Sequence, residues 1–410
     1  MVESTGIYIS VPFCRAKCTY CNFASGVFGA ERMDRYVDCV CAEMRESRGR
    51  AALMGAELPA RVDTVFLGGG TPSLLGAEQV GRLFAALRSE FDVAEGAEIT
   101  LECAPGQLGA ETLEEMLRQG MNRVSFGVQS FVDREAAGVG RLHTREMCLA
   151  EIERMRAAGL ANINVDLIAG LPQQTAASWR ESVETAIGTG VPHVSMYMLE
   201  VDEDSRLGRE VLAAGAKYGA GAVPSEDETA EWYGAACEWL AEAGVRQYEI
   251  SNFAREGCES RHNVKYWRRQ PYVGFGLDAH SMLRTGEGAV RWANTSELDR
   301  YEVEGSRFEA GSERLVQFGA KATAEPEIEV IGKDAAFEES LFLGLRMNVG
   351  VDMEALRAEF GEGLMGGALE ALADVEEAGM VEREGNCLRL TARGRMASNE
   401  VFSRLLVAAV

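Results

Sequence analysis

The stretch Ile7-Tyr8-Ile9-Ser10-Val11-Pro12-Phe13-Cys14-Arg15-Ala16-Lys17-Cys18-Thr19-Tyr20-Cys21 joins an apolar run to three closely spaced cysteines. The apolar run predicts a buried strand. The spacing Cys-x3-Cys-x2-Cys gives a cuboidal [4Fe-4S] cluster three thiolates and leaves its fourth iron open. A structural zinc site is the main alternative, but zinc needs four protein ligands, usually from two Cys-x2-Cys pairs, and no second pair exists here. We therefore predict that Cys14, Cys18 and Cys21 bind an iron-sulfur cluster.

Composition narrows the class of protein. The chain has 410 residues, 41 Lys and Arg against 64 Asp and Glu, and a net charge of −23, which disfavours a nucleic-acid partner. No apolar leader follows Met1, and no apolar run approaches the roughly 20 residues that span a bilayer, so we expect a cytoplasmic protein that is not an integral membrane protein. In the cytoplasm thiols stay reduced and available to iron. The seven cysteines outside the motif show no comparable grouping and are predicted to be mostly core.

Short apolar or β-branched runs alternate with helical patterns along the first half of the chain. This alternation predicts an α/β fold in which crossover helices connect parallel strands. Six βα units are countable, which indicates a partial (β/α)6 barrel of the TIM-like kind. The predicted strands are Ile7–Phe13, Val62–Leu67, Glu98–Glu102, Arg123–Val128, Ile163–Ile168 and His193–Leu199.

Polar and glycine residues mark one end of these strands. In βα barrels the active site is built at the C-terminal ends of the strands, so these residues are expected to meet at one rim. A glycine edge there could bind the amino group of an amino-acid-like cofactor that chelates the open iron, although a triple glycine is often only a tight turn. Ordinary surface polarity is the alternative for each polar residue. The cysteines follow the first strand and Gly68-Gly69-Gly70-Thr71 the second; Glu102 ends the third, Gln129 follows the fourth, Asp166 lies in the fifth and Glu200 follows the sixth. Arg141 would add one fixed cation.

The motifs together resemble the radical S-adenosylmethionine (SAM) superfamily, over nearly the whole chain. The similar segments are residues 8–14, the glycine motif 68–73, Ser125 to Phe131, Gly140 to His143 and Asn164 to Pro172. The resemblance implies a cluster that cleaves SAM reductively to methionine and a 5'-deoxyadenosyl radical. It also implies SAM contacts from Tyr8, Gly69, Glu102, Gln129, Arg141 and Asp166, with Gly70 and Thr71 nearby.

Within the superfamily the motifs resemble the group that contains oxygen-independent coproporphyrinogen III oxidases and heme chaperones, and two features separate the oxidases from the chaperones. The oxidases carry a further cysteine two residues after the third ligand, whereas this chain reads Cys21-Asn22-Phe23, as the chaperones do. The segment His262-Asn263-Val264-Lys265-Tyr266-Trp267 matches the chaperones' His-Asn-x-x-Tyr-Trp pattern. An imidazole can ligate heme iron and aromatic faces can cover a macrocycle. The resemblance thus implies heme contacts from His262, Asn263, Tyr266 and Trp267. A loop histidine beside two core aromatics is the alternative.

Two functions from different classes follow. The first is a heme chaperone that delivers heme to acceptor apoproteins; the second is an enzyme that decarboxylates the propionates of coproporphyrinogen III. A third, a cluster protein without turnover, also stays open. Either of the first two would need a reductant such as flavodoxin or ferredoxin, and no catalytic residue is assigned. His143 and His193 are predicted to be structural, while His280 is either a second heme contact or a core histidine.

The last hundred residues differ in pattern from the barrel. Helical stretches and one hairpin, around Gly385-Asn386, predict a mainly helical, winged-helix-like domain. Such modules often bind DNA, but this one has no concentrated basic helix. We predict a barrel domain over 1–305 and a C-terminal domain over 306–410.

Overall fold

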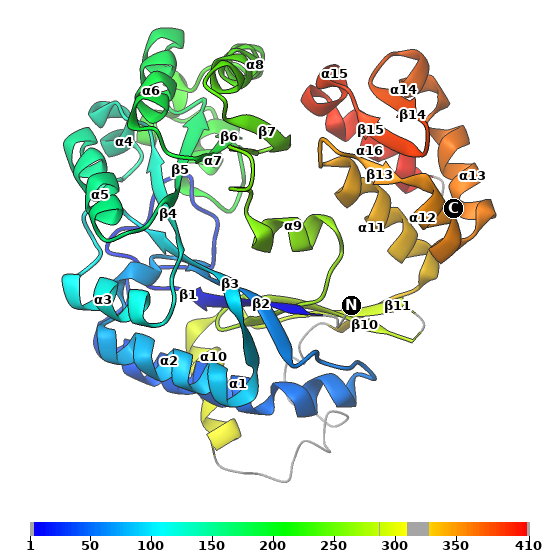
Figure 1. Cartoon of the computed structure of the whole chain (residues 1–410). Coiled ribbons are helices and arrows are strands. Elements are labelled where there is room, and N and C mark those ends of the chain that lie inside the picture. The colour runs from blue at the N-terminus through cyan, green and yellow to red at the C-terminus, as the bar shows by residue number, and fades with distance from the viewer. Residues whose placement is uncertain (1–3, 287, 310–327, 408–410) are drawn as a thin grey trace.

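A twelve-stranded sheet forms the centre of the molecule in the computed structural model, which describes residues 4–286, 288–309 and 328–407 (Figure 1). Six strands lie side by side in chain order, and each is parallel to the next. The predicted partial barrel of six βα units is confirmed. Its strands are β1 (Thr5–Val11), β2 (Arg61–Gly69), β3 (Asp92–Cys103), β4 (Arg123–Gln129), β5 (Asn162–Ala169) and β6 (His193–Met198).

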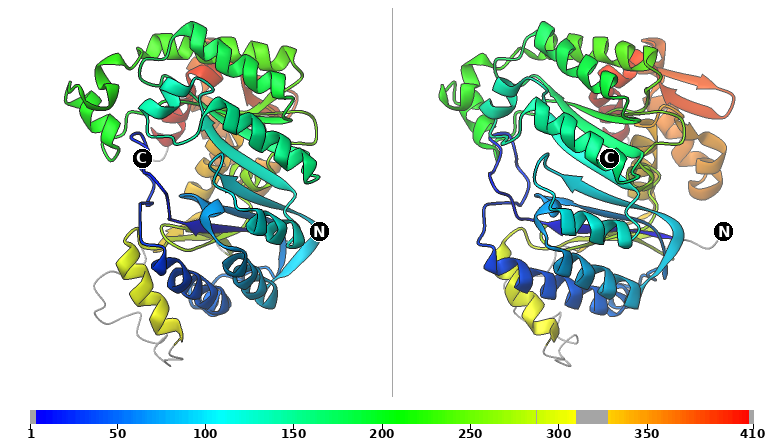
Figure 2. Two further views of the ribbon diagram at one scale, coloured as in Figure 1. Left: turned by 90° about the vertical axis from the view of Figure 1, so that its left-hand side faces the viewer. Right: turned by 60° about the vertical axis from the view of Figure 1, so that its left-hand side comes forward.

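Helices connect these strands and cover the outer face of the sheet (Figure 2). Alternate strand residues such as Ile9, Leu67 and Val165 point to the helices and are fully buried, in one core cluster with helix residues such as Met44 and Trp179. The period-2 alternation of strands and the wide apolar stripe of each helix produce this layer. The crossover helices are α1 (Glu31–Leu53), η1 (Pro72–Leu74), α2 (Ala77–Glu90), α3 (Ala110–Arg118), α4 (Asp133–Gly138), α5 (Arg145–Ala157) and α6 (Ala176–Thr189).

The inner face of the barrel is polar. Positions that alternate with the core residues carry Thr64, Glu102, Ser125, Asn164 and Asp166. Thr64 bonds to His262, and the other four hydrogen-bond to one another or to backbone. TIM barrels ordinarily fill this space with branched apolar side chains. Here polar side chains replace that apolar packing, and they line the candidate site.

Further strands extend the sheet at both edges. β9 (Tyr272–Phe275) runs parallel to β1, and three antiparallel strands follow it; on the other edge β8 (Asn252–Ala254) pairs with β6. These additions were not predicted, since their runs are short. The remaining elements up to residue 331 are α7 (Arg206–Leu212), η2 (Lys217–Ala222), α8 (Glu226–Glu242), β7 (Arg246–Glu249), β8 (Asn252–Ala254), α9 (Arg261–Trp267), β10 (His280–Thr285), β11 (Gly288–Ala293), α10 (Leu298–Glu309) and β12 (Ile328–Ile331).

A small C-terminal domain lies beside α9 and the β10–β11 hairpin, and its apolar core also includes Met282 and Ala289 of that hairpin (Figure 1). Helices surround a three-stranded sheet of order β13-β15-β14, and the predicted hairpin around Gly385 is confirmed. The elements are α11 (Lys333–Leu345), β13 (Val351–Asp352), α12 (Met353–Phe360), α13 (Glu362–Ala371), α14 (Ala373–Glu377), β14 (Val381–Glu384), β15 (Cys387–Leu390), α15 (Ala392–Met396) and α16 (Ser398–Val407).

The division between the domains at 305/306 stays a prediction, because residues 310–327 lie outside the described residues. Two neighbouring elements belong to the barrel side: α10 continues to Glu309 and packs on α1, and β12 pairs with β11. Among the described residues, no helix has the length and apolarity that crossing a membrane requires.

Candidate SAM and iron-sulfur site

A cavity of about 360 Å³ opens at the C-terminal ends of the six parallel strands. It gathers side chains that are far apart in the sequence, as the strand-end rule predicts. Of the residues predicted to bind SAM, only Tyr8 does not line it. The predicted residues in its wall are Cys14, Cys18, Cys21, Gly69, Gly70, Thr71, Glu102, Gln129, Arg141 and Asp166.

Backbone hydrogen bonds hold the loop that carries the three cysteines. The Cys14 N–H donates to the Gly26 carbonyl at 2.8 Å, and the Thr19 N–H donates to the Val139 carbonyl at 3.0 Å. The Thr19 carbonyl in turn accepts from the N–H of Leu207 in α7. The loop has no regular secondary structure, yet it is tied to α4 and α7, so the cysteines are held in place by distant parts of the chain.

The chemistry of these three thiols fits a cluster better than a single ion. All ten cysteines are free, and no group of three His, Cys, Asp or Glu side chains in the described part of the chain converges on one ion position. In a cuboidal cluster each thiolate binds a different iron, so the ligands need not converge on one point. Cys14, Cys18 and Cys21 would hold three irons, and a reduced cluster there would supply an electron to bound SAM.

Glu102 is the most strongly perturbed acid of the cavity. Its carboxylate accepts a hydrogen bond from the Gly69 N–H at 3.2 Å, and Gly69 can present this N–H because it adopts a positive φ of 101°. Burial and, to a smaller extent, the charge of Asp166 raise the pKa of Glu102 to about 8. Glu102 is therefore largely protonated at neutral pH and can donate or accept a hydrogen bond.

Asp166 and Arg141 bring the other charges. Asp166 accepts hydrogen bonds from Asn164 at 2.7 Å and from Ser125 at 3.3 Å, while burial raises its pKa. Arg141 donates to the Gly127 carbonyl and to the Cys18 sulfur, and its Nε is buried without a partner among the described residues. An unpaired buried guanidinium N–H is costly and is the kind of group that a bound carboxylate satisfies.

Gln129 reaches the cavity through an irregular strand end. The register between β4 and β5 shifts between Gly127 and Gln129, and Gln129 has a φ of +69°, which is unusual for a residue other than glycine. Such bulges re-aim side chains next to active sites. The bulge directs the Gln129 side chain into the cavity wall.

A second, inner cavity of about 230 Å³ lies deeper in the barrel and shares Glu102, Asp166, Ser125 and Tyr197 with the first. Tyr8 lines this inner cavity, where burial raises its pKa well above the ordinary value. Tyr8, predicted to contact SAM, therefore lines the inner cavity and not the outer cavity that the other predicted SAM residues line.

The structure does not bring the four predicted heme residues to one accessible face. His262 is 1% exposed; its Nδ1 lies 2.8 Å from the Thr64 hydroxyl and its Nε2 2.8 Å from the Tyr266 hydroxyl. Burial lowers the pKa of His262 to about 3, so the ring is neutral. His262, Asn263 and Tyr266 line the inner cavity, but Trp267 faces Arg346, whose guanidinium lies 4.3 Å from the ring centre.

The remaining histidines are also placed. His193 bonds to Asn164 and Tyr248, and His143 lies 3.0 Å from the Val128 carbonyl, with burial lowering the pKa of His143 to about 4. Both are buried, which fits the predicted structural role. His280 is exposed on β10 and lines neither cavity.

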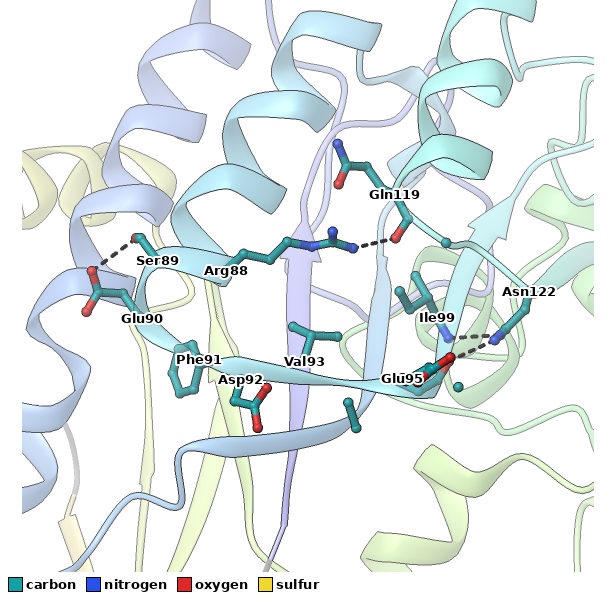
Figure 3. Close-up of a pocket in the computed structure, with 14 residues that line it drawn as sticks. Arg88, Ser89, Glu90, Phe91, Asp92, Val93, Glu95, Ile99, Gln119 and Asn122 are labelled. Atoms are coloured by element: carbon teal, nitrogen blue, oxygen red, sulfur yellow. Dashed lines mark hydrogen bonds between the residues drawn. The ribbon is translucent and has the colours of Figure 1, made fainter.

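A larger hollow of about 800 Å³ lies near the N-terminal half of β3, away from the cysteines (Figure 3). Its polar groups are satisfied locally: Arg88 donates to the Gln119 carbonyl, and Asn122 bonds to the backbone of Ile99 and Ala97. Size therefore does not identify the site, because the reactive and perturbed groups lie in the smaller cavity.

Several wall residues were not predicted as ligands. Tyr197 and Met198 end β6, and Phe23 follows the third cysteine; all three are exposed apolar side chains that line the outer cavity. Applying the strand-end rule to β6 in full would have found Tyr197 and Met198. The position of Phe23 depends on the path of the cysteine loop, which no periodicity encodes.

The chain matches the family model described as "Radical SAM superfamily" over residues 8–186 and the "HemN C-terminal domain" over 331–397. It is 31% identical to the heme chaperone HemW of Bacillus subtilis, with 97% of this chain and 98% of that protein covered. The HemW of Mycobacterium tuberculosis is 33% identical, with 98% and 94% covered. The chain belongs to the HemW family of radical SAM proteins.

A solved structure supports the same fold. Coproporphyrinogen III oxidase (HemN) of Escherichia coli, described as a radical SAM enzyme, superposes with a TM-score of 0.80 at 22% identity, covering 98% of this chain and 90% of that one. Membership of the radical SAM family implies a [4Fe-4S] cluster and SAM, and the residues predicted to bind them, except Tyr8, line the strand-end cavity.

Proposed function

We propose that this protein is a heme chaperone that carries a [4Fe-4S] cluster on Cys14, Cys18 and Cys21, binds SAM beside it and delivers heme to acceptor apoproteins. The similarity to HemW proteins over nearly the full length carries this proposal. The cavity supports it, because the predicted cluster ligands and most of the predicted SAM contacts line one wall.

Each cavity residue has a chemical task in this proposal. Arg141 would pair with the SAM carboxylate, and the backbone of Gly69 and Gly70 would approach its amino group. Glu102, Asp166 and Gln129 would bond to ribose hydroxyls or other polar groups of the nucleoside. The barrel would exclude water from the reacting bond.

Heme is proposed to contact His262, Asn263, Tyr266 and Trp267, and this requires movement of α9. The helix is held by Glu98, which accepts from the N–H groups of Arg261 and His262, and by a 2.8 Å ion pair between Lys265 and Asp63. One ring nitrogen of His262 must give up its present partner, Thr64 or Tyr266, before it can ligate iron, while the other can keep its hydrogen bond. The apparent heme affinity would then be reduced by the small population in which α9 has withdrawn.

The proposed partners are heme, heme-accepting apoproteins and an electron donor such as flavodoxin or ferredoxin. We propose a cytoplasmic location, because a three-thiolate cluster and ten free cysteines suit a reducing compartment.

Oxygen-independent coproporphyrinogen III oxidase activity is the second candidate. One observation favours it. Arg141, Asp166 and Glu102 all line the cavity, so the side chains that an enzyme would need to bind SAM are present. The segment Cys21-Asn22-Phe23 disfavours it, because the oxidases' additional cysteine is replaced by exposed Phe23.

Heme titration of His262→Ala, followed by absorbance, tests the heme site. His143→Ala is the matched control, because His143 is also buried and hydrogen-bonded but lines neither cavity. We expect His262→Ala to lower heme affinity at least tenfold and His143→Ala to bind heme like the wild type. Wild-type affinity in His262→Ala would place the heme elsewhere, and failure of the wild type to bind heme would contradict the chaperone function.

A further inference from the structure

One side-chain donor lies near each of the three predicted cluster sulfurs at a distance given below, and these three side chains come from different parts of the chain. Tyr20 also bonds to Cys18, and the backbone of Phe23 to Cys21. Sulfur is larger than oxygen, so donor distances up to about 4 Å are compatible with such bonds. The pairs are Thr71 Oγ1 to Cys14 Sγ at 3.8 Å, Arg141 Nη1 to Cys18 Sγ at 3.5 Å, and Ser25 Oγ to Cys21 Sγ at 3.9 Å.

Cluster binding fixes the direction of these bonds. A thiolate ligand carries no proton, so its sulfur can only accept a hydrogen bond. Between Cys21 and Ser25 either free side chain could donate, but once Cys21 is a ligand only the Ser25 hydroxyl can. Arg141 is always charged and therefore provides the strongest of the three bonds.

The backbone holds the two hydroxyl donors in place. The Thr71 N–H donates to the Phe13 carbonyl at 2.8 Å, and this bond ties the loop after β2 to the residue before Cys14. The Ser25 N–H donates to the Phe23 carbonyl at 2.7 Å. Thr71 and Ser25 are both 8% exposed, so water competes little for their hydroxyls.

We propose that Thr71, Ser25 and Arg141 are positioning residues that set the reduction potential of the cluster, each by donating one hydrogen bond to one ligating sulfur. The inference rests on the proposed cluster at Cys14, Cys18 and Cys21. Reduction places additional negative charge on the cluster and its sulfurs, and donors stabilise that charge, which raises the potential. Thr71, which was predicted to lie near SAM, is thereby proposed to act on the cluster, through its hydrogen bond to the Cys14 sulfur.

The test is an EPR-monitored redox titration of the full chain, anaerobically reconstituted with iron and sulfide and measured without SAM. Thr71→Val and Ser25→Ala each remove one donor at nearly constant shape. Thr19→Val is the matched control, because Thr19 lies in the same loop and its buried hydroxyl has no hydrogen-bond partner among the described residues. Arg141 is left unchanged because it is also a predicted SAM contact.

We expect Thr71→Val and Ser25→Ala to lower the midpoint potential, the double variant to lower it further, and Thr19→Val to leave it at the wild-type value. A tenfold fall in the reduced-to-oxidised ratio at a fixed potential corresponds to 59 mV for one electron. Unchanged potentials in both single variants, or an equal shift in Thr19→Val, would overturn the proposal.

Two further measurements separate the possible failures. If Thr71→Val assembled no cluster, Thr71→Ser, which keeps the hydroxyl, must retain the wild-type potential, and Ser25→Ala must still lower it; otherwise the proposal fails. If the wild type itself assembled no [4Fe-4S] cluster by EPR and iron analysis, the proposed function would fail. A normal cluster whose potential ignores both hydroxyls would contradict only the present inference.

Discussion

Glu102 shows how a single position in a barrel strand acquires unusual chemistry. It points into the polar interior, where burial and Asp166 raise its pKa to about 8. In the unfolded chain the carboxyl would ionise near its ordinary value of about 4.3. The folded protein therefore binds one more proton than the unfolded chain between these two pH values.

This difference makes the stability of the ligand-free protein depend on pH. Because the unfolded state binds fewer protons in this window, the Glu102 contribution to the free energy of unfolding falls as pH rises from about 4.5 to 8. Glu102→Gln is expected to remove this loss, so that the variant gains stability over the wild type towards pH 8. Urea unfolding at pH 5 to 8 measures this difference in the free energy of unfolding. Glu200→Gln is the control, because Glu200 is an exposed carboxyl of the same cavity. Parallel curves for wild type and Glu102→Gln would contradict the raised pKa.

The identities of the site residues could be predicted, but not all of their surroundings. Glu102 and Asp166 lie in one cavity because strand ends meet at one rim, and Arg141 reaches the same cavity from the loop between α4 and α5. The sequence does not show that the aromatic and hydroxyl partners of His262 come from α9 and β2. That information resides in the packing of a seven-residue helix, for which no periodicity exists.

The loop after β2 is the element on which the cluster loop rests. The N–H groups of Gly70 and Thr71 donate to the carbonyls of Val11 and Phe13. A Cβ atom on Gly70 would lie 2.8 Å from the Val11 carbonyl oxygen and 2.9 Å from that of Phe13, which is closer than real side chains approach. The glycine is thus required for the close contact of two backbones.

Gly70→Ala is expected to push these two loops apart and to destabilise the fold by about 1–3 kcal/mol, the usual cost of overpacking. Because Cys14 follows Phe13, the iron content after reconstitution should fall as well. Gly76→Ala is the control, since its Cβ would meet only the Gln79 side chain at 3.8 Å. Iron analysis and urea unfolding of both variants give the result; equal iron content in the two would show that the contact does not support the cluster.

The six parallel strands were predictable because each is an apolar or β-branched run between helical patterns. β2 and β3 extend beyond their predicted ranges, from Arg61 to Gly69 and from Asp92 to Cys103, since glycine and charged residues hide the ends of a strand. β9 to β12 were missed, because strands of four to six residues carry too little alternation to distinguish them from loops.

At the scale of the molecule, ion pairs join the C-terminal domain to the barrel. Glu339 of α11 accepts from Arg269 at 2.8 Å and from Arg291 at 2.5 Å, and Arg269 is nearly buried. Arg346 pairs at 3.3 Å with Glu249, which is fully buried, and stacks on Trp267. The C-terminal domain therefore contacts the same helix, α9, that carries the predicted heme segment.

Glu339→Ala would leave Arg269 buried without its carboxylate, a change that costs about 3–5 kcal/mol. We expect calorimetry to show a lower melting temperature and separate transitions for the barrel and the C-terminal domain. Glu338→Ala, at the neighbouring position, removes a carboxylate that pairs with neither arginine and should keep the wild-type transition. Wild-type melting of Glu339→Ala would mean that other contacts hold the domain.

The central claim, a heme chaperone built on a radical SAM barrel, is tested most directly by one comparison on the anaerobically reconstituted protein. Portions of the same sample receive either heme, followed by absorbance, or coproporphyrinogen III with SAM and a reductant, followed by product analysis. We predict stoichiometric heme uptake and no protoporphyrinogen. Formation of the decarboxylated product would contradict the claim and make the protein an oxidase that works without the additional cysteine.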